Sequence, residues 1–579
     1  MRRRMIVPVL LLALVTAGLP AAAAETGDSG GVSGRFDRPH PGFAPFWTTL
    51  RASTPERAGL DPAPINAALE KIKNWTQPQG TAKPLFSGAV TLLAHDGQVV
   101  TRTATGQALR YADGIGTELP PEQQAPMRTD TIFDLASISK LFTSIAVMQQ
   151  VEAGRVDLAR TVASYLPEFA ANGKDAITVK QLLTHTSGLP PFLPLWRDHP
   201  DKPSRILGAL TAKLQQPPGK AYIYSDLNLI ALGVLVEKVT GDPLDVLVRK
   251  GITEPLGMRD TGYNPADKAR TAATEYMTVP ARGMVRGEVH DENAWSLGGV
   301  AGHAGVFGTA EDLAVLGQTI LNGGAYRGHR ILRERTLRQM MTNHNTGFPD
   351  NAHGLGFELD QRWYMEGLSS PRTAGHTGFT GTSLVVDPVS RSVAVLLSNR
   401  VHPSRAWGSN NPARRALAQG FAQSLAVHPR HGRDAWHSAA NEEQAAVLRT
   451  GPLYQRGPAT LNFAAFVDTE ATDKVSVEAS VDGGVSWQPL TLTATGPGAP
   501  ADAVTTLAGA GHRAWWRVSA SLPPAASVTL RWRYASDKQY TGRGVFLDGI
   551  RISDRRGVLL DAERHPETLT AQGWTPVRR

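Results

Sequence analysis

The sequence contains no cysteine among its 579 residues. This absence excludes a disulfide scaffold, thiol catalysis and cysteine-ligated zinc, so the fold must rely on its hydrophobic cores. The His-Glu-x-x-His motif of zinc peptidases and the P-loop motif of nucleotide-binding enzymes are also absent, and we expect neither a metal nor another cofactor. Lys and Arg are spread thinly after the first four residues, which makes nucleic acid an unexpected partner.

The first residues have the layout of a secretory signal peptide. Three arginines at positions 2–4 precede the apolar run 5–19, which is followed by small residues. This pattern predicts that residues 1–24 are cleaved off just before Glu25. No later segment is apolar enough to span a membrane. We therefore expect a secreted protein, extracellular or associated with the cell wall, that keeps no stable membrane anchor after cleavage.

The length of the chain predicts two or more domains. Residues 25–44 are rich in Gly, Ser, Asp and Pro and are expected to form a flexible leader. Residues 45–427 are expected to form a first domain, and the polar residues 428–449 a linker. Residues 450–579 contain short alternating runs separated by turns such as Asp482-Gly483-Gly484, which is typical of a β-sandwich.

Within the first domain, the sequence predicts strands at both ends and helices between them. The expected strands are residues 87–94 and 98–102, around an Asp-Gly turn, and residues 381–386 and 392–397; the expected helices are residues 137–152, 227–239, 310–321 and 413–425. Strands from the two ends should pair in one antiparallel sheet flanked by helices, with a mainly helical subdomain beside it. The expected class is therefore α/β (α+β).

Ser137 and Lys140 are the first candidate pair for chemistry. Their spacing of three residues places both side chains on one face of the predicted helix. A serine hydroxyl is a weak nucleophile until a neighbour takes its proton, and burial can lower the pKa of a lysine enough to help. The free N–H groups at the helix start can also support an oxyanion. Taken alone, the pattern is common, and Ser137 could equally be a helix N-cap.

Two later motifs occur in a recognisable order. Tyr224-Ser225-Asp226 leads into a helix, and His376-Thr377-Gly378 starts a strand. The order Ser-x-x-Lys, Tyr-x-Asn, Lys/His-Thr-Gly resembles that of the penicillin-recognising serine hydrolases, the family of class C β-lactamases and serine D-alanyl-D-alanine carboxypeptidases. The similarity extends over residues 50–426, and the resemblance implies a β-lactamase/transpeptidase-like fold for this region.

The resemblance also implies roles for individual residues. Ser137 would attack a carbonyl to form an acyl-enzyme, while Lys140 and Tyr224 share the proton transfer. The main-chain N–H groups of Ser137 and Phe379 would form the oxyanion hole. Water would then release the product.

The substrate would be held by the His-Thr-Gly strand. His376 and Thr377 would contact a substrate carboxylate or the acyl chain, which would lie along the strand beside Gly378. Asp226 stands where the family usually has asparagine, which donates to a substrate carbonyl. An ionised carboxylate can only accept, and it favours a protonated Lys140. Asp226 therefore disfavours recognition of an acylamino side chain, and it favours simple esters as substrates.

These residues leave several functions open. The leading expectation is a hydrolase of D-alanyl peptides from peptidoglycan, β-lactams or small esters. The alternatives are an esterase or D-amino-acid amidase, or a penicillin-binding or wall-binding protein that is acylated without turnover. The C-terminal region resembles the jelly-roll accessory modules of secreted enzymes and could bind cell-wall glycan. Its tryptophans could stack on sugars or belong to the core, and Asp548 alone does not define a calcium site.

Overall fold

The computed structural model describes residues 34–438, 445–537, 539–540 and 542–578. The predicted signal peptide lies outside the described residues. Within these ranges, no helix combines the length and the apolar character that crossing a membrane requires.

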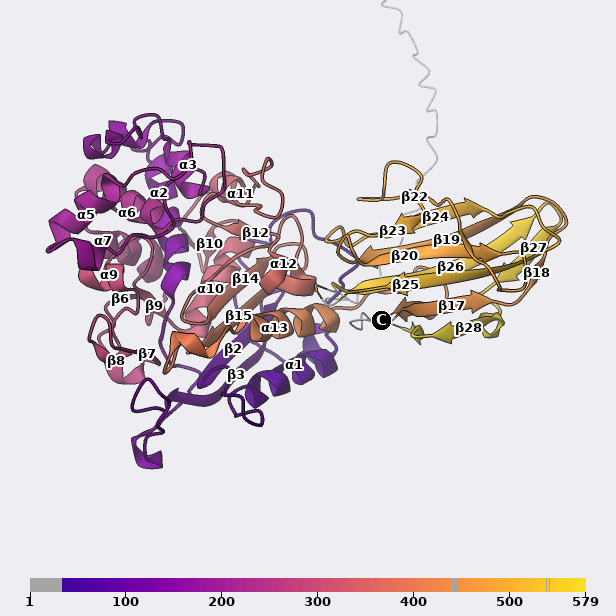
Figure 1. The fold of residues 1–579 in the computed structure, drawn as a ribbon, viewed down its shortest axis with the longest axis horizontal. Helices are drawn as coiled ribbons and strands as arrows, with labels where there is room; N and C mark the ends of the chain where they lie inside the picture. The colour runs from indigo at the N-terminus through magenta and orange to yellow at the C-terminus, as the bar shows by residue number, and fades with distance from the viewer. Residues whose placement is uncertain (1–33, 439–444, 538, 541, 579) are drawn as a thin grey trace, which may run out of the picture. The chain divides into compact units, whose positions relative to one another are not determined.

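The first domain is organised around a central sheet with the strand order β1-β3-β2-β15-β14-β13-β12 (Figure 1). The strands are β1 (Arg51–Ala52), β2 (Gly88–His95), β3 (Gln98–Leu109), β12 (Glu358–Leu359), β13 (Ala374–Thr377), β14 (Thr382–Asp387) and β15 (Ser392–Ser398). The early strand β2 pairs antiparallel with the late strand β15, and β2 and β3 form the expected hairpin. The prediction of a sheet assembled from both ends of the domain is confirmed.

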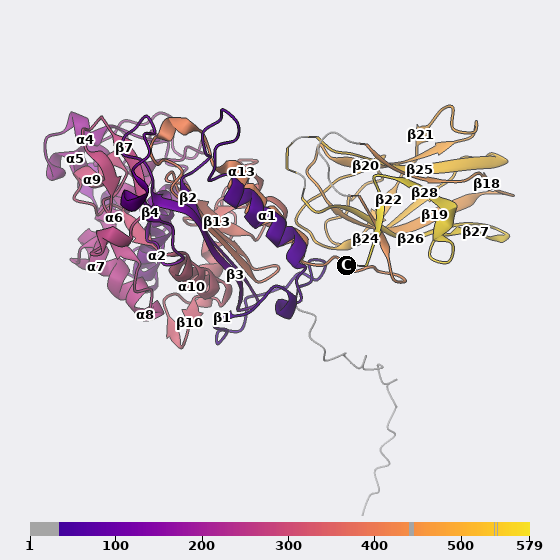
Figure 2. The ribbon, with the colours of Figure 1, turned by 90° about the horizontal axis from the view of Figure 1, so that it is seen from below.

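Helices cover both faces of this sheet. Along β15, Val393 and Val395 belong to one hydrophobic core, whereas Ala394 and Leu396 belong to another. Because both faces are buried, the strand is apolar throughout rather than alternating. Helices α1 (Pro62–Asn74) and α13 (Asn411–Ser424) lie side by side against one face, and α10 (Ala310–Leu321) packs on the other (Figure 2).

A second group of helices holds the residues that the sequence marks for chemistry. Helix α2 (Ser139–Glu152) packs against α6 (Asp226–Thr240), and buried side chains occur around most of both helices. The residues Ala136–Ile138 form a short 3-10 turn before α2. Ser137 therefore lies at the entrance of a buried helix, and Asp226 lies at the first position of a neighbouring one.

The C-terminal region is a β-sandwich, as predicted. One sheet has the order β22-β24-β19-β26-β16-β29 and the other the order β21-β20-β25-β17-β28. Its longer strands are β19 (Ala459–Asp468), β20 (Lys474–Ser480), β24 (Trp515–Ser521), β25 (Ser527–Ala535) and β26 (Gly544–Asp554). Trp516 and Trp532 are fully buried in the core between the sheets, so these two belong to the core.

Two segments that were expected to be irregular contribute to the folded structure. In the expected leader 25–44, Phe36 is only 1% exposed, and its N–H donates to the carbonyl of Ala426 at 2.7 Å. The expected linker 428–449 contains β16 (Ala435–Ser438), which pairs with β26 and β29. Polar composition was misleading here because a few apolar or aromatic contacts suffice to anchor such segments: His437, for example, stacks on Phe546 with 4.1 Å between ring centroids.

Candidate active site

Ser137 lies in a strained turn immediately before α2. The preceding residue, Ala136, has φ of 46°, in the left-handed region that disfavours side chains. The Asp134 carboxylate accepts the Ala136 N–H at 2.9 Å, and Thr380 Oγ1 donates to the Asp134 carbonyl at 2.7 Å. These bonds hold the turn in place. The Ser137 N–H lies in the first turn of the helix, where main-chain donors have no intrahelical partner.

The strain at Ala136 leads to a first prediction. Ala136→Gly should stabilise the protein by up to about 1 kcal/mol, because glycine tolerates the left-handed conformation. The same change should lower kcat several-fold, since the turn would hold Ser137 less firmly. Thermal unfolding and ester hydrolysis measured on the same preparation test both effects. Destabilisation by this substitution would contradict the strain at residue 136.

The end of β13 approaches this turn closely. A Cβ atom on Gly378 would lie 2.1 Å from Thr382 Oγ1 and 2.4 Å from the Leu135 carbonyl oxygen. Position 378 therefore requires glycine, because the turn that contains Ser137 approaches the main chain there. The next residue, Phe379, keeps its side chain 48% exposed. The structure thus brings the His-Thr-Gly strand and the start of α2 together.

Lys140 lies at the centre of the site and is 1% exposed. Its Nζ is 2.7 Å from Ser137 Oγ and 2.8 Å from Asp226 Oδ1. It also donates to the main-chain carbonyl of His303 at 3.2 Å and lies 4.8 Å from the centroid of the Tyr224 ring. Three segments of the chain, around residues 137–140, 224–226 and 303, therefore meet at one ammonium group.

The protonation states in this cluster agree with one sequence-based expectation and differ from another. Burial alone would lower the pKa of Lys140, but Asp226 and Tyr224 together outweigh burial and raise this pKa above its ordinary value. Burial raises the pKa of Tyr224 to about 12, although the Lys140 charge opposes that shift. The expectation that burial lowers the pKa of Lys140 is therefore wrong for the resting site, whereas the expectation that Asp226 favours a protonated Lys140 agrees with it. At neutral pH Lys140 is a cation and Tyr224 a neutral phenol.

His376 carries no positive charge in this environment. Burial and the nearby Lys140 lower its pKa to about 3, and its Nδ1 lies 2.7 Å from the Thr377 carbonyl oxygen. A substrate carboxylate would need another cation. Arg414 donates to the Gly378 carbonyl at 2.7 Å from a buried position, and the Arg400 guanidinium lies 5.1 Å from the Phe379 ring centroid.

Two further histidines support the site, and sequence reasoning assigned neither of them a role. His185 accepts the Ser225 N–H at 3.1 Å through Nδ1, and its ring lies 4.6 Å from that of Tyr224. Burial lowers the pKa of His185 well below the usual range. The uncharged His185 ring therefore packs beside the Tyr224 ring. His303, whose carbonyl contacts Lys140, places Nε2 2.8 Å from Asp291 Oδ1. The sequence signal was that His185 lies in Leu182-Leu183-Thr184-His185-Thr186-Ser187-Gly188-Leu189 and His303 in Gly302-His303-Ala304-Gly305, phrases that also resemble the family.

The acidic groups around Lys140 do not suit a metal ion. One oxygen or nitrogen atom from each of Asp226, Asp291 and His303 lies within 4.8 Å of the others. However, Lys140 already places its positive charge 2.8 Å from Asp226, and a second cation at this position would be repelled. The carboxylates act as counter-ions for the ammonium instead.

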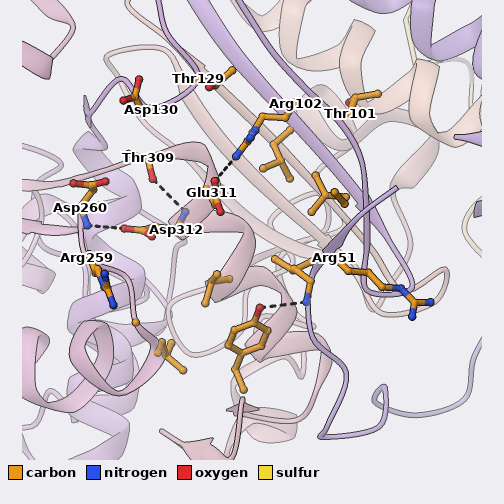
Figure 3. A pocket seen from close by; sticks show the side chains of 18 of the residues that line it. Arg51, Thr101, Arg102, Thr129, Asp130, Arg259, Asp260, Thr309, Glu311 and Asp312 are labelled. Atoms are coloured by element: carbon orange, nitrogen blue, oxygen red, sulfur yellow. Dashed lines mark hydrogen bonds and ion pairs between the residues drawn. The ribbon is translucent and has the colours of Figure 1, made fainter. Parts of the chain in front are cut away.

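A separate hollow of about 780 Å³ lies between β1, β3 and α10 (Figure 3). Its charged side chains are of both signs: Arg102 pairs with Glu311, and Asp312 accepts the Asp260 N–H at 3.0 Å. None of the sequence-predicted site residues lines this hollow, and no lysine does within the part of the chain that the structure describes. It therefore offers no alternative to the Ser137–Lys140 pair.

Comparison with known proteins gives consistent matches over the first domain. The family model described as beta-lactamase matches residues 78–419. A protein of Escherichia coli (strain K12) named "Putative D-alanyl-D-alanine carboxypeptidase" is 34% identical over 406 residues, which are 63% of this chain and 89% of that protein. A penicillin-binding protein homologue from Caulobacter crescentus is similar in structure, with a TM-score of 0.49 and 23% identity over 63% of this chain and 99% of that one.

Proposed function

The chain belongs to the beta-lactamase family, and we propose that it is a serine carboxypeptidase that cleaves D-alanyl peptides through an acyl-enzyme on Ser137. The observation that carries this proposal is the position of Lys140 Nζ between Ser137 Oγ and Asp226 Oδ1, at 2.7 and 2.8 Å. The name of the relative at 34% identity supports the choice of substrate class.

In the proposed reaction, Ser137 Oγ attacks the substrate carbonyl while its proton passes to the Lys140–Tyr224 pair. The pair can accept this proton only after it has lost one of its own, because both groups are protonated in the resting site. The N–H groups of Ser137 and Phe379 stabilise the oxyanion. The pair then protonates the leaving amine, and water hydrolyses the acyl-enzyme. We therefore expect the activity to rise with pH on the acid side of its optimum.

Arg400 is the group best suited to a free substrate carboxylate. Its neighbour Arg405 is already paired with Glu275 and Glu292 at 2.6 Å each, whereas Arg400 makes no ion pair within the described residues. His376 is neutral. Thr377 would offer its hydroxyl to the acyl chain along β13, whereas the N–H and the carbonyl of Gly378 are already bonded to the Thr382 carbonyl and to Arg414. The terminal carboxylate of a D-alanyl peptide would then lie on the Phe379 side of the site.

Arg400→Gln tests this assignment. We expect kcat/KM for an acyl-D-alanyl-D-alanine peptide to fall about 10-fold, because a charge-assisted hydrogen bond is lost. The same peptide with an amidated carboxyl terminus should be hydrolysed at an unchanged rate. Arg259→Gln, which removes a positive charge from the separate hollow, serves as the control. Equal losses on both peptides would contradict the role of Arg400.

A second candidate function is favoured by Asp226. An ionised carboxylate cannot donate a hydrogen bond to the acylamino carbonyl of a peptide or β-lactam. A simple ester has no acylamino group, so it loses no hydrogen bond at this position. A kcat/KM for a neutral nitrophenyl ester far above that for any D-alanyl peptide or D-amino-acid amide would identify an esterase. Stable acylation by penicillin without product release would identify a binding protein.

We also propose that the protein acts outside the cell. The support is the basic and apolar layout of residues 1–24, and amino-terminal sequencing of the exported protein tests it. A contact between the sandwich and wall glycan is a further part of this proposal. Trp487 is a partly exposed tryptophan that could take part in it, and its ring centroid lies 5.2 and 4.2 Å from the guanidinium groups of Arg449 and Arg531.

A further inference from the structure

Three carboxylates converge at one end of the β-sandwich, in the region that the catalytic proposal does not use. Glu470 and Asp473 lie in the connection between β19 and β20, and Asp537 follows β25. One oxygen atom of each lies within 4.8 Å of the other two. The register of the sheet explains this, because Lys474 at the start of β20 is paired with Ala535 at the end of β25.

Two buried oxygen atoms at this place have no hydrogen-bond partner among the residues that the structure describes. The Asp473 side chain is 0% exposed, and its Oδ1 accepts the Asp537 N–H at 2.8 Å, whereas its Oδ2 is unpaired. The hydroxyl of Tyr534, a residue 1% exposed, is also unpaired. Buried polar atoms are nearly always satisfied in native proteins. Their presence beside a group of carboxylates indicates a ligand that supplies positive charge.

The geometry of the group agrees with this indication. Three carboxylates whose oxygen atoms lie within 4.8 Å of one another repel each other when ionised, and a bound cation would remove this repulsion.

We propose that Glu470, Asp473 and Asp537 bind a calcium ion that ties the β19–β20 connection to the end of β25. The donors are all oxygen, which suits a hard cation, and they lie in connections rather than on rigid elements. Calcium accepts six to eight oxygen ligands in flexible geometry and can complete its shell with main-chain carbonyls and water. Magnesium demands a nearly ideal octahedron and keeps several waters, so it fits less well.

Asp548, the other acid of the sandwich considered for calcium, is already satisfied. Its Oδ2 accepts the N–H groups of Arg430 and His431 at 2.5 and 2.7 Å, and its Oδ1 accepts that of Gly549 at 2.7 Å. It holds the chain between the two domains and does not belong to the calcium site.

The test uses the full chain, stripped with EDTA and titrated with CaCl₂. Calorimetry should give a dissociation constant on the order of 10⁻⁴ M, as in extracellular calcium modules. The midpoint of thermal unfolding should rise by about 5 °C at saturating calcium. Terbium should bind at the same position and luminesce when the neighbouring tyrosine is excited. Asp473→Asn and Glu470→Gln should each weaken binding at least 10-fold, whereas the exposed Asp502→Asn should not.

The proposal also predicts that removing a ligand does not destabilise the metal-free protein. In EDTA, Glu470→Gln should unfold at the same temperature as the original protein or above it, because it removes like-charge repulsion. Two results would overturn the proposal: a midpoint that is the same in EDTA and calcium, or terbium binding that Asp473→Asn and Glu470→Gln leave intact. An equal rise with magnesium would overturn the assignment to calcium.

Discussion

Ser137→Ala is expected to lower kcat/KM by about 10⁴-fold or more on every substrate that the protein turns over. The proposed acyl-enzyme forms on Ser137 Oγ, and the structure places this atom 2.7 Å from Lys140 Nζ. What survives the substitution is the oxyanion stabilisation and binding, which accelerate a reaction only weakly without the nucleophile. Stopped or continuous assays with a nitrophenyl ester and a D-alanyl peptide would measure the loss.

Ser144→Ala provides a matched control on the same helix. Ser144 lies in α2, and its buried Oγ has no hydrogen-bond partner in the described structure, so removing the hydroxyl should leave activity within about 2-fold. Mass spectrometry after incubation with a penicillin should detect an adduct on the original protein and on Ser144→Ala. An adduct that persists on Ser137→Ala, or activity above 1% of the original, would exclude Ser137 as nucleophile.

Elements with strong periodicity were predictable from the sequence. The helix at 310–321 matches α10 residue for residue, because its apolar face, its capping Thr309 and its length are all local features. The Ser137–Lys140 contact also follows from helical spacing. The partners of that pair, Tyr224 and Asp226, could be identified only through the order of the motifs, because nothing local relates them to Lys140.

Long-range electrostatics and anchoring contacts were not predictable. The family resemblance let us expect that Asp226 favours a protonated Lys140, but the distance of 2.8 Å between the two side chains, on which the raised pKa of Lys140 depends, is set by the tertiary fold. The contact of Lys140 with the His303 carbonyl depends on the main chain approaching closely, where a Cβ on Gly302 would lie 1.9 Å from the Leu229 carbonyl oxygen. Phe36 and β16 likewise fold because of partners that lie far along the chain.

Asp226→Asn is expected to change substrate preference more than any other substitution outside the nucleophile and its proton acceptors. The new amide can donate to an acylamino carbonyl, whereas the carboxylate cannot. One added hydrogen bond should raise the ratio of kcat/KM for a D-alanyl peptide or β-lactam to that for a simple ester by about 10-fold. Because the prediction concerns a ratio, it can be measured even if both absolute rates fall.

The same substitution should shift the pH dependence in a definite direction. Asp226 raises the pKa of Lys140 and contributes to the raised pKa of Tyr224. Without this negative charge, burial dominates at Lys140, and the Lys140–Tyr224 pair should release its first proton at lower pH. The acid limb of kcat/KM against pH should therefore move to lower pH.

Asp226→Glu, which keeps the charge, is the control and should leave the acid limb near its original pH. A limb that stays fixed in Asp226→Asn would mean that Asp226 does not control the proton acceptor, and a fixed substrate ratio would mean that it does not face the acyl group.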